Sequence, residues 1–136
     1  MKIVDVVLSK SYTGFFFDDQ KAIKNGAVND GFFYVGTPEI EGFSSIRQRG
    51  EAISIQLILE NGDVGTGDCA AVQYSGTGGR DPLFLADNYI PFLEENIVPM
   101  LIGLEVKEFR TLAEKFDRMI LNGKKLHTAI RYGLTQ

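Results

Sequence analysis

The run from Gly67 to Pro82, GDCAAVQYSGTGGRDP, holds the residue types of this chain best suited to chemistry. It combines the amide side chain of Gln73 with four glycines and the pair Arg80-Asp81. Glycines at this density let a backbone approach a ligand closely or adopt positive φ, at a cost in folding entropy. Loops that carry such a cost are often functional. The Gln73 amide either satisfies nearby backbone groups or faces a ligand.

A phosphate cradle is the first chemistry to consider for this loop. Gly76 and Gly78 begin a GxG pattern, but Asp81 occupies the position of the third glycine, and no Gly-Lys-Ser/Thr follows. The triplet Gly65 to Gly67 with Ala70 matches GxGxxA formally, yet we expect it in a hairpin arm and not at a strand-to-helix turn. A small phosphate-binding protein is therefore an alternative hypothesis; it predicts a measurable nucleotide affinity, which we do not expect.

Nucleophilic and metal chemistry lack partners in this sequence. Cys69 is distant in sequence from the single histidine, His127, so we interpret Cys69 as a small buried residue. We interpret His127 as a hydrogen-bonded structural histidine. One His and one Cys cannot form a zinc site, and the aspartates show no EF-hand spacing. We expect Asp18-Asp19 to cap a helix at 20–24. The sequence thus predicts no catalytic residue and no metal ligand in this chain.

The elements that position the loop are strands followed by helices. Residues 3–8 and 51–60 are predicted strands, the second with clean alternation, and another strand starts at Val64. Between them Asn61-Gly62 predicts a type I′ hairpin turn. Residues 11–42 are rich in glycine and aromatics, which favours an irregular lid or binding loop. The prediction is an α+β fold with an antiparallel sheet of about three strands and a helical segment.

Three apolar stripes at helical spacing follow the glycine loop. Asp81 is the expected N-cap of the first helix, with Pro82 as its first residue and Pro91 kinking or splitting it. The second stripe covers 109–120 and should end at Asn122-Gly123, so that Lys124-Lys125 enters the next helix. The third, from Leu126 to Leu134, has no stop signal and is predicted to expose an apolar face. A homodimer through 126–134 is one prediction from that stripe.

Composition places the chain among ordinary globular proteins. Its 136 residues suit one domain, and a net charge of −4 favours neither nucleic acid nor an anionic membrane. The N-terminus lacks the apolar core of a signal peptide, and no apolar run is long enough to span a membrane. A single cysteine excludes a disulfide framework, so the expected location is the cytoplasm.

Four stretches of the chain resemble one known family: TGFFFDDQKAIKNGA, SSIRQRGEAISIQLIL, GDCAAVQYSGTGGRDPLFLA and LHTAIRYGLTQ. They are similar to the N-terminal region of methylaspartate ammonia-lyase (3-methylaspartase), a member of the enolase superfamily. The resemblance implies that residues 1–125 form an N-terminal α+β capping domain. Residues 126–136 would be a truncated helix leading toward a (β/α) barrel that this chain does not contain.

The resemblance also implies the reaction, which removes ammonia from threo-3-methylaspartate to give mesaconate. A lysine base and three carboxylates that bind Mg²⁺ would lie on the barrel, beyond Gln136. Only Gln73 falls on a substrate-contacting position of the family, and 14–36 matches its mobile cap loop. The expected partners are a barrel domain or chain and an amino-acid substrate, and the chain alone should be inactive. The alternative is a non-catalytic binding or assembly module that reuses the fold.

Overall fold

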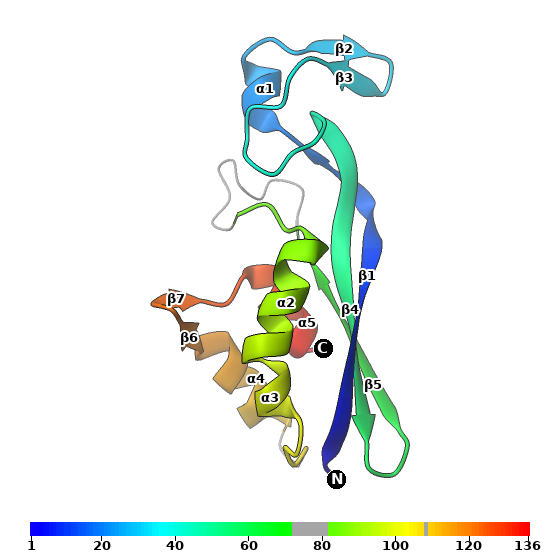
Figure 1. Ribbon diagram of the computed structural model, residues 1–136, viewed down its shortest axis with the longest axis vertical. Coiled ribbons are helices and arrows are strands. Elements are labelled where there is room, and N and C mark those ends of the chain that lie inside the picture. Colours follow the sequence, from blue (N-terminus) through cyan, green and yellow to red (C-terminus); the bar gives the residue numbers. More distant parts are fainter. Residues whose placement is uncertain (72–81, 108) are drawn as a thin grey trace.

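A three-stranded antiparallel sheet with helices along one side forms the body of the chain (Figure 1). The structure is a computed structural model that describes residues 1–71, 82–107 and 109–136. The strand order is β1-β4-β5, with β1 at Ile3–Asp18, β4 at Arg47–Leu59 and β5 at Val64–Ala70. The predicted α+β class and the sheet of about three strands are confirmed.

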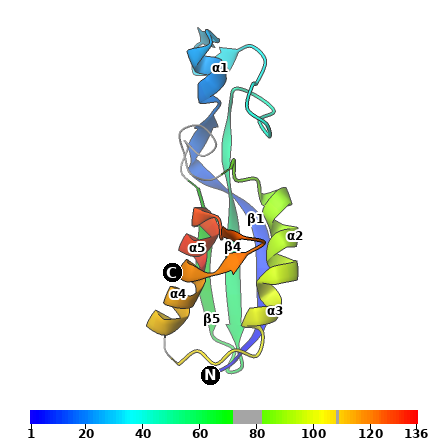
Figure 2. The same cartoon turned by 90° about the vertical axis from the view of Figure 1, so that its left-hand side faces the viewer.

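The alternation of β4 separates a core face from an open face. Ile53 and Ile55 are 0% and 3% exposed, whereas Ser54 is half-buried and Gln56 is exposed. Figure 2 looks onto the helical side, where α2 (Ala86–Asn96) and α3 (Val98–Leu101) lie along β1 and α5 (Thr128–Leu134) lies along β5. Helix α4 (Phe109–Arg118) packs beside α5. One continuous apolar core therefore sits between the sheet and the helices.

The segment expected to be irregular is largely ordered, so that prediction is wrong. Strand β1 continues to Asp18, and α1 (Gln20–Lys24) follows with Asp19 as its N-cap, as predicted. A hairpin of β2 (Val28–Asp30) and β3 (Phe33–Val35) completes this distal end of the molecule. These elements bury few side chains and are interrupted by glycines, so their sequences show no hydrophobic periodicity from which they could be predicted.

A bulge in β1 shapes the sheet where it approaches the distal end. Tyr12 pairs with Glu51 and Phe16 pairs with Arg49, so three residues of β1 face only Gly50 of β4. A Cβ at Gly50 would lie 2.8 Å from the carbonyl oxygen of Phe15. Glycine is therefore required there to let the bulged strand cross its neighbour closely.

The first long helix begins later than the sequence suggested. Residues 82–85 are not helical, and α2 starts at Ala86, whose N–H donates to Glu51 Oε1 at 3.0 Å. A carboxylate from β4 thus satisfies the helix N-terminus, and Pro82 is not the first helical residue; Asp81 lies outside the described residues. Helix α2 also runs through Pro91 without dividing, and the break comes at Ile97.

Both Asn-Gly pairs with a predicted role lie in β-hairpins: the hairpin predicted at Asn61-Gly62 is confirmed but its turn type is not, and the helix stop predicted at Asn122-Gly123 is wrong. Between β4 and β5 only Gly62 has positive φ (+90°), and its N–H donates to Leu59 O at 2.8 Å, the pattern of a type I turn followed by a glycine bulge. Asn122 and Gly123, with φ of 52° and 77°, form instead the type I′ turn of a short hairpin, β6 (Ile120–Leu121) and β7 (Lys124–Lys125). Helix α4 ends before them, and Lys124-Lys125 is an exposed strand.

The third apolar stripe is not an exposed face. Leu126, Ala129 and Ile130 are 3%, 1% and 0% exposed because α5 lies against β5. Gly133 allows this contact: a Cβ there would lie 2.5 Å from Cys69 Sγ and 2.9 Å from its amide nitrogen. The expectation of an open apolar face on this helix is wrong, since the chain covers the stripe with its own sheet.

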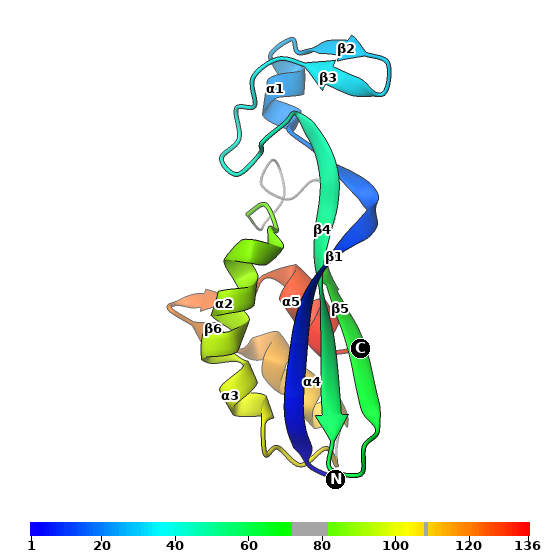
Figure 3. The same cartoon turned by 45° about the vertical axis from the view of Figure 1, so that its right-hand side comes forward.

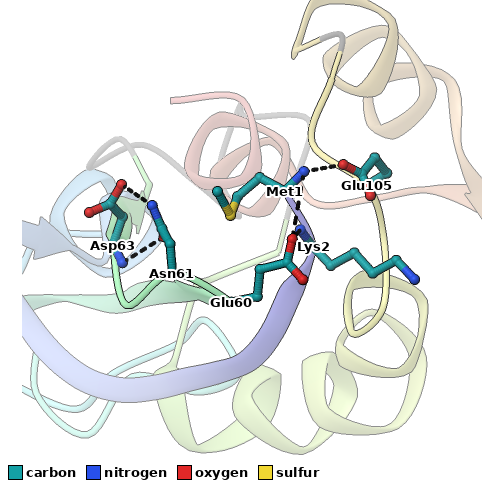
Figure 4. Close-up of polar contacts among 6 residues, drawn as sticks. All are labelled: Met1, Lys2, Glu60, Asn61, Asp63 and Glu105. Carbon is teal, nitrogen blue, oxygen red and sulfur yellow. Dashed lines mark hydrogen bonds and ion pairs between the residues drawn. The ribbon is translucent and has the colours of Figure 1, made fainter.

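The proximal end of the sheet is closed by polar contacts around the first residues (Figure 4). The Met1 ammonium pairs with Glu105 and lies 4.0 Å from Glu60 Oε1, which accepts the Lys2 N–H at 3.2 Å. The hydrogen bond and the positive charge of the ammonium lower the pKa of Glu105 despite some desolvation. These contacts fix the start of β1 to the β4–β5 hairpin and to the segment after α3.

Candidate functional site

The segment that carries Gln73 runs between two residues that the structure places. Gln73, Arg80 and Asp81 themselves lie outside the described residues. Before them, Ala71 follows β5 and is 8% exposed. After them, Pro82 leads toward α2 along the helical side of the sheet (Figure 1). The structure therefore places the residues on both sides of the Gln73 segment, Ala71 and Pro82, which we call its anchors.

His127 holds the second anchor. Its Nδ1 accepts the Ala129 N–H at 3.1 Å and so caps α5, which requires the ring proton on Nε2, 2.9 Å from the carbonyl oxygen of Pro82. The ring packs against Phe84 and Tyr89, with centroids 5.0 and 5.2 Å away. His127 is thus a hydrogen-bonded structural histidine, as predicted, and it ties Pro82, at the end of the Gln73 segment, to the last helix.

A hollow of about 770 Å³ opens beside the bulge of β1. It is lined by residues 11–15 of the bulge and by Ala52, Ser54, Asp68, Ala70 and Ala71 of β4, β5 and the first anchor. Ser54 Oγ donates to Asp68 Oδ1 at 2.8 Å. The rest of this lining is small, aromatic or uncharged, so the described part of the hollow can accept an apolar group.

Cys69 is buried, and its thiol is unreactive at neutral pH. Its side chain is fully buried (0% exposed) under α5, and burial, reinforced by the charge of Asp68, raises the pKa of the thiol to about 12. The reactive thiolate is therefore scarce at neutral pH. The structure supports the packing role that the sequence suggested.

Two charged residues at the distal end do more than the sequence indicated. Asp19 is 0% exposed; its Oδ1 accepts the Ala22 N–H at 3.0 Å, and its Oδ2 accepts the N–H groups of Glu39 and Ile40 at 2.6 and 2.9 Å. Burial opposes its ionisation, but these hydrogen bonds prevail and lower its pKa. The helix cap therefore also anchors the segment that leads back to β4. Only the capping half of this role had a local sequence signal.

Arg47 is the second charged residue with a structural role at the distal end, and its neighbours in the sequence gave no signal of that role. Its Nε and Nη2 donate to the two oxygens of Asp18 at 2.7 and 2.9 Å, and its Nη1 donates to Phe32 O at 2.6 Å. The guanidinium lies over the rings of Phe32 and Tyr34, 4.7 and 5.0 Å from their centroids. One side chain thus joins β4, β1 and the β2–β3 hairpin.

Metal binding finds no support in the described part of the chain. No three His, Cys, Asp or Glu side chains gather there in a way that could hold an ion. The residues in ranges 1–71, 82–107 and 109–136 therefore do not fit a Mg²⁺ site. Within the same ranges, none of the helices is long and apolar enough to cross a membrane.

Comparison with known proteins gives the family. The sequence model of the methylaspartate ammonia-lyase N-terminus matches residues 1–136. This chain belongs to that family. It is 61% identical to the methylaspartate ammonia-lyase of Clostridium tetanomorphum over 136 residues, which are 100% of this chain and 33% of that enzyme. The chain thus spans about one third of the length of the curated relatives it matches.

Solved structures of these relatives share the fold. The Mg complex of the Clostridium tetanomorphum β-methylaspartase superposes with a TM-score of 0.96, covering 99% of this chain and 33% of that one. The Citrobacter amalonaticus enzyme, solved with (2S,3S)-3-methylaspartic acid, is 58% identical with a TM-score of 0.95, covering 99% and 33%. The Clostridium enzyme has also been solved as the mutant Q73A, with a TM-score of 0.95.

Proposed function

We propose that this methylaspartate ammonia-lyase N-terminal domain covers the active site of an enzyme that converts threo-3-methylaspartate to mesaconate and ammonia. The match of all 136 residues to one third of such enzymes, at 61% identity and a TM-score of 0.96, carries the proposal. The relative solved with (2S,3S)-3-methylaspartic acid supports the substrate. In this proposal residues 1–125 form the cap, and 126–136 lead from it toward a (β/α) barrel.

The proposal divides the work between cap and barrel. The described residues provide no cluster of metal ligands, and burial raises the pKa of the Cys69 thiol to about 12. We therefore assign the lysine base and the Mg²⁺ ligands to the barrel, and the Mg complex of a relative supports the identity of the ion. The cap contributes substrate contact and exclusion of water, so the chain alone should be inactive.

Gln73 is the residue of this chain that we propose contacts substrate. An amide N–H can donate to a substrate carboxylate, and amides keep this ability at every working pH. The Clostridium tetanomorphum enzyme has been solved as the mutant Q73A, which supports the choice of Gln73 as the residue to test. The two anchors at Ala71 and Pro82, one buried and the other held by His127, are suited to present such a segment.

The test joins this chain to the remaining two thirds of the Clostridium tetanomorphum enzyme. We expect the joined protein to release mesaconate and ammonia from (2S,3S)-3-methylaspartate in the presence of Mg²⁺, and the 136-residue chain alone to release neither. A joined protein that folds but shows no turnover would refute the proposal and favour the non-catalytic module. Turnover by the chain alone would refute the assignment of the catalytic base and the Mg²⁺ ligands to the barrel.

Gln73→Ala in the joined protein tests the contact. A hydrogen bond to a charged group contributes about 1.5–3 kcal/mol, so kcat/KM should fall roughly ten- to hundredfold. Gln56→Ala is the matched control, because Gln56 is an exposed amide on the open face of β4; its kinetics should stay at the parent values. Equal kinetics for both variants would remove Gln73 from the site.

Two further parts of the proposal concern the cell and the assembly. The buried free thiol of Cys69 and the absence of other cysteines favour the cytoplasm. The stripe at 126–134 gives no support to a homodimer, because α5 is buried on β5. The barrel is the partner that we propose, and sedimentation of the joined protein would establish its oligomeric state.

A further inference from the structure

Three asparagines of the chain are followed directly by glycine: Asn25, Asn61 and Asn122. Glycine has no side chain to keep its backbone nitrogen away from the asparagine amide, so Asn-Gly is the dipeptide most prone to spontaneous deamidation. All three asparagines are exposed, so access to water does not distinguish them. Their hydrogen bonds do.

Deamidation needs a local rearrangement of the backbone. The backbone nitrogen of the glycine gives up its proton and attacks Cγ of the asparagine, so that an N–Cγ bond forms and the Cγ–Nδ2 bond breaks. The amide group leaves as ammonia and takes that proton, and water then opens the cyclic imide to aspartate or isoaspartate. Hydrogen bonds that hold the side-chain amide and the glycine N–H in place therefore slow the reaction, because they must open first.

At Asn61 both reacting groups are held (Figure 4). The side chain donates from Nδ2 to Asp63 Oδ2 at 2.7 Å and accepts the Asp63 N–H on Oδ1 at 3.0 Å. The Gly62 N–H donates to Leu59 O at 2.8 Å, inside the hairpin that joins β4 to β5. The neighbouring carboxylates of Glu60 and Asp63 also oppose a negative charge on the attacking nitrogen. The fold thus protects this pair.

Asn25 is held in a comparable way at the end of α1. Its Nδ2 donates to both carboxylate oxygens of Glu39, at 2.9 and 3.1 Å. The Gly26 N–H donates to Ile23 O at 3.2 Å. Deamidation at Asn25 therefore requires contacts with two other segments to break, and a carboxylate lies beside the amide here too.

Asn122 lacks these restraints. Among the described residues, none forms a hydrogen bond with its side chain. Leu121 pairs with Lys124, so the hydrogen bond that closes the turn comes from the Lys124 N–H and leaves the Gly123 N–H outside it. A Cβ at Gly123 would meet no atom within 4 Å, which shows that the space around the turn is open. Both reacting groups are therefore free to move.

The hairpin that carries Asn122 also opens easily. Figure 1 and Figure 3 both show β6–β7 projecting from the helical side of the molecule. Each of its strands has only two residues, and so small a hairpin has little stability of its own. Lys124 and Lys125 follow the turn and are exposed. Their positive charges favour the negatively charged nitrogen that attacks Cγ, the opposite of the situation at Asn61.

We propose that Asn122 is a site of spontaneous deamidation, which converts it to aspartate and isoaspartate while the fold preserves Asn25 and Asn61. The inference is independent of the proposed function. It adds a covalent change that needs no enzyme and no reactant other than water. One neutral amide is replaced by a carboxylate, so each event makes the chain more negative by one charge.

The two products differ in their effect on the turn. Aspartate tolerates the positive φ of 52° at position 122. Isoaspartate carries an extra carbon in the backbone, so the two-residue turn no longer brings Leu121 opposite Lys124. The hairpin leads directly to His127, which caps α5. Isoaspartate should therefore loosen the entry to this helix, measured as faster amide exchange at Ala129.

The test compares the three pairs within one protein. The joined protein is incubated at pH 8, folded and in urea, and is then digested at acid pH, where the reaction is slow. Aspartate and isoaspartate at each position are separated by chromatography and quantified by mass spectrometry. Because glycine follows each asparagine, the three rates in urea should agree within about threefold, the variation that residual structure in the denatured chain allows. They are the reference for the folded rates.

In the folded protein we expect Asn25 and Asn61 to react at least about tenfold more slowly than in urea, and Asn122 to stay within about threefold of its rate in urea. Protection of Asn122 equal to that of the other two would overturn the proposal, and so would faster loss at either of them. Asp63→Ala removes the acceptor from Asn61 Nδ2, so the folded rate at Asn61 should rise at least about threefold while that at Asn122 stays unchanged. An unchanged rate at Asn61 would show that these hydrogen bonds do not protect it, which also overturns the argument.

Discussion

Asp19→Asn is the most informative perturbation of the cap, because one buried carboxylate holds two segments together. The carboxylate accepts N–H groups from Ala22 on one oxygen and from Glu39 and Ile40 on the other. An asparagine can keep an acceptor toward only one side. Its NH₂ then faces N–H donors that have no acceptor, at a site that is 0% exposed.

The expected cost follows from the number of bonds lost. If the amide oxygen caps α1, the bonds from Glu39 and Ile40 are lost, and each hydrogen bond to a charged group contributes about 1.5–3 kcal/mol. Taking the lower value because neighbouring bonds are not additive, the variant should lose about 3 kcal/mol at pH 7. Asp30→Asn, at an exposed aspartate of β2, is the control and should change stability by less than about 0.5 kcal/mol.

Urea unfolding of the chain, followed by circular dichroism, measures the global part of this loss. Amide hydrogen exchange at Glu39 and Ile40 measures the local part, since the segment before β4 can open without the core. The reasoning is refuted if Asp19→Asn remains within about 0.5 kcal/mol of the parent and these two amides exchange no faster.

The pH dependence of the same variant gives an independent check. The folded state lowers the pKa of Asp19, so this carboxylate binds fewer protons when folded. Its contribution is fully present above the ordinary aspartate pKa of about 3.9 and is lost as the pH falls through the lower folded value. The parent should therefore lose stability more steeply than Asp19→Asn below about pH 4. Parallel curves would exclude a specific role for the ionised form.

Three further changes test other parts of the structure. Arg47→Lys removes the two-pronged contact with Asp18 and the ring stacking, so the amides of the β2–β3 hairpin should exchange at least about tenfold faster while those of the core do not. Gly133→Ala should lower the free energy of unfolding by about 1–3 kcal/mol, because its Cβ would meet Cys69. Gly14→Ala is the control and should be nearly neutral in thermal unfolding, since no atom lies within 4 Å of its Cβ. Equal effects of the two substitutions would contradict the packing of α5 on β5. Cys69 should not react with a thiol reagent at pH 8 until the chain unfolds, and fast native reaction would show that the thiol is accessible.

The parts of the fold that the sequence predicted are those governed by local pattern. The alternation along 51–60 gave the central strand and its core face, because residues two apart share a side of any strand. Asp19 before Gln20 gave a helix cap because that contact spans three residues. Membership of the family, confirmed over residues 1–136, came from long runs of identity and not from any single motif.

Two of the wrong predictions share a physical cause, which is competition from distant partners. A local rule placed the start of the first helix at Pro82, but Glu51 of β4 satisfies the helix N-terminus at Ala86 instead. The Asn61-Gly62 pair suits a type I′ turn, yet β4 and β5 pair in a register that needs one more residue in the loop. Local sequence defines what a segment can do, and the pairing of the strands selects among those options.

The same reasoning explains why the candidate site was only partly predicted. Gln73 was proposed from its residue type and from the family resemblance, and its contact with substrate stays a proposal. Arg47 escaped notice because its meaning depends on Asp18, 29 residues away, and on rings carried by a hairpin that periodicity did not reveal. A residue such as Gln73 can be proposed from its type and its neighbours in sequence, whereas a residue that holds segments together, such as Arg47, is defined by contacts between those segments. In a cap whose proposed task is to place one amide over another domain, this second class determines where the amide can reach.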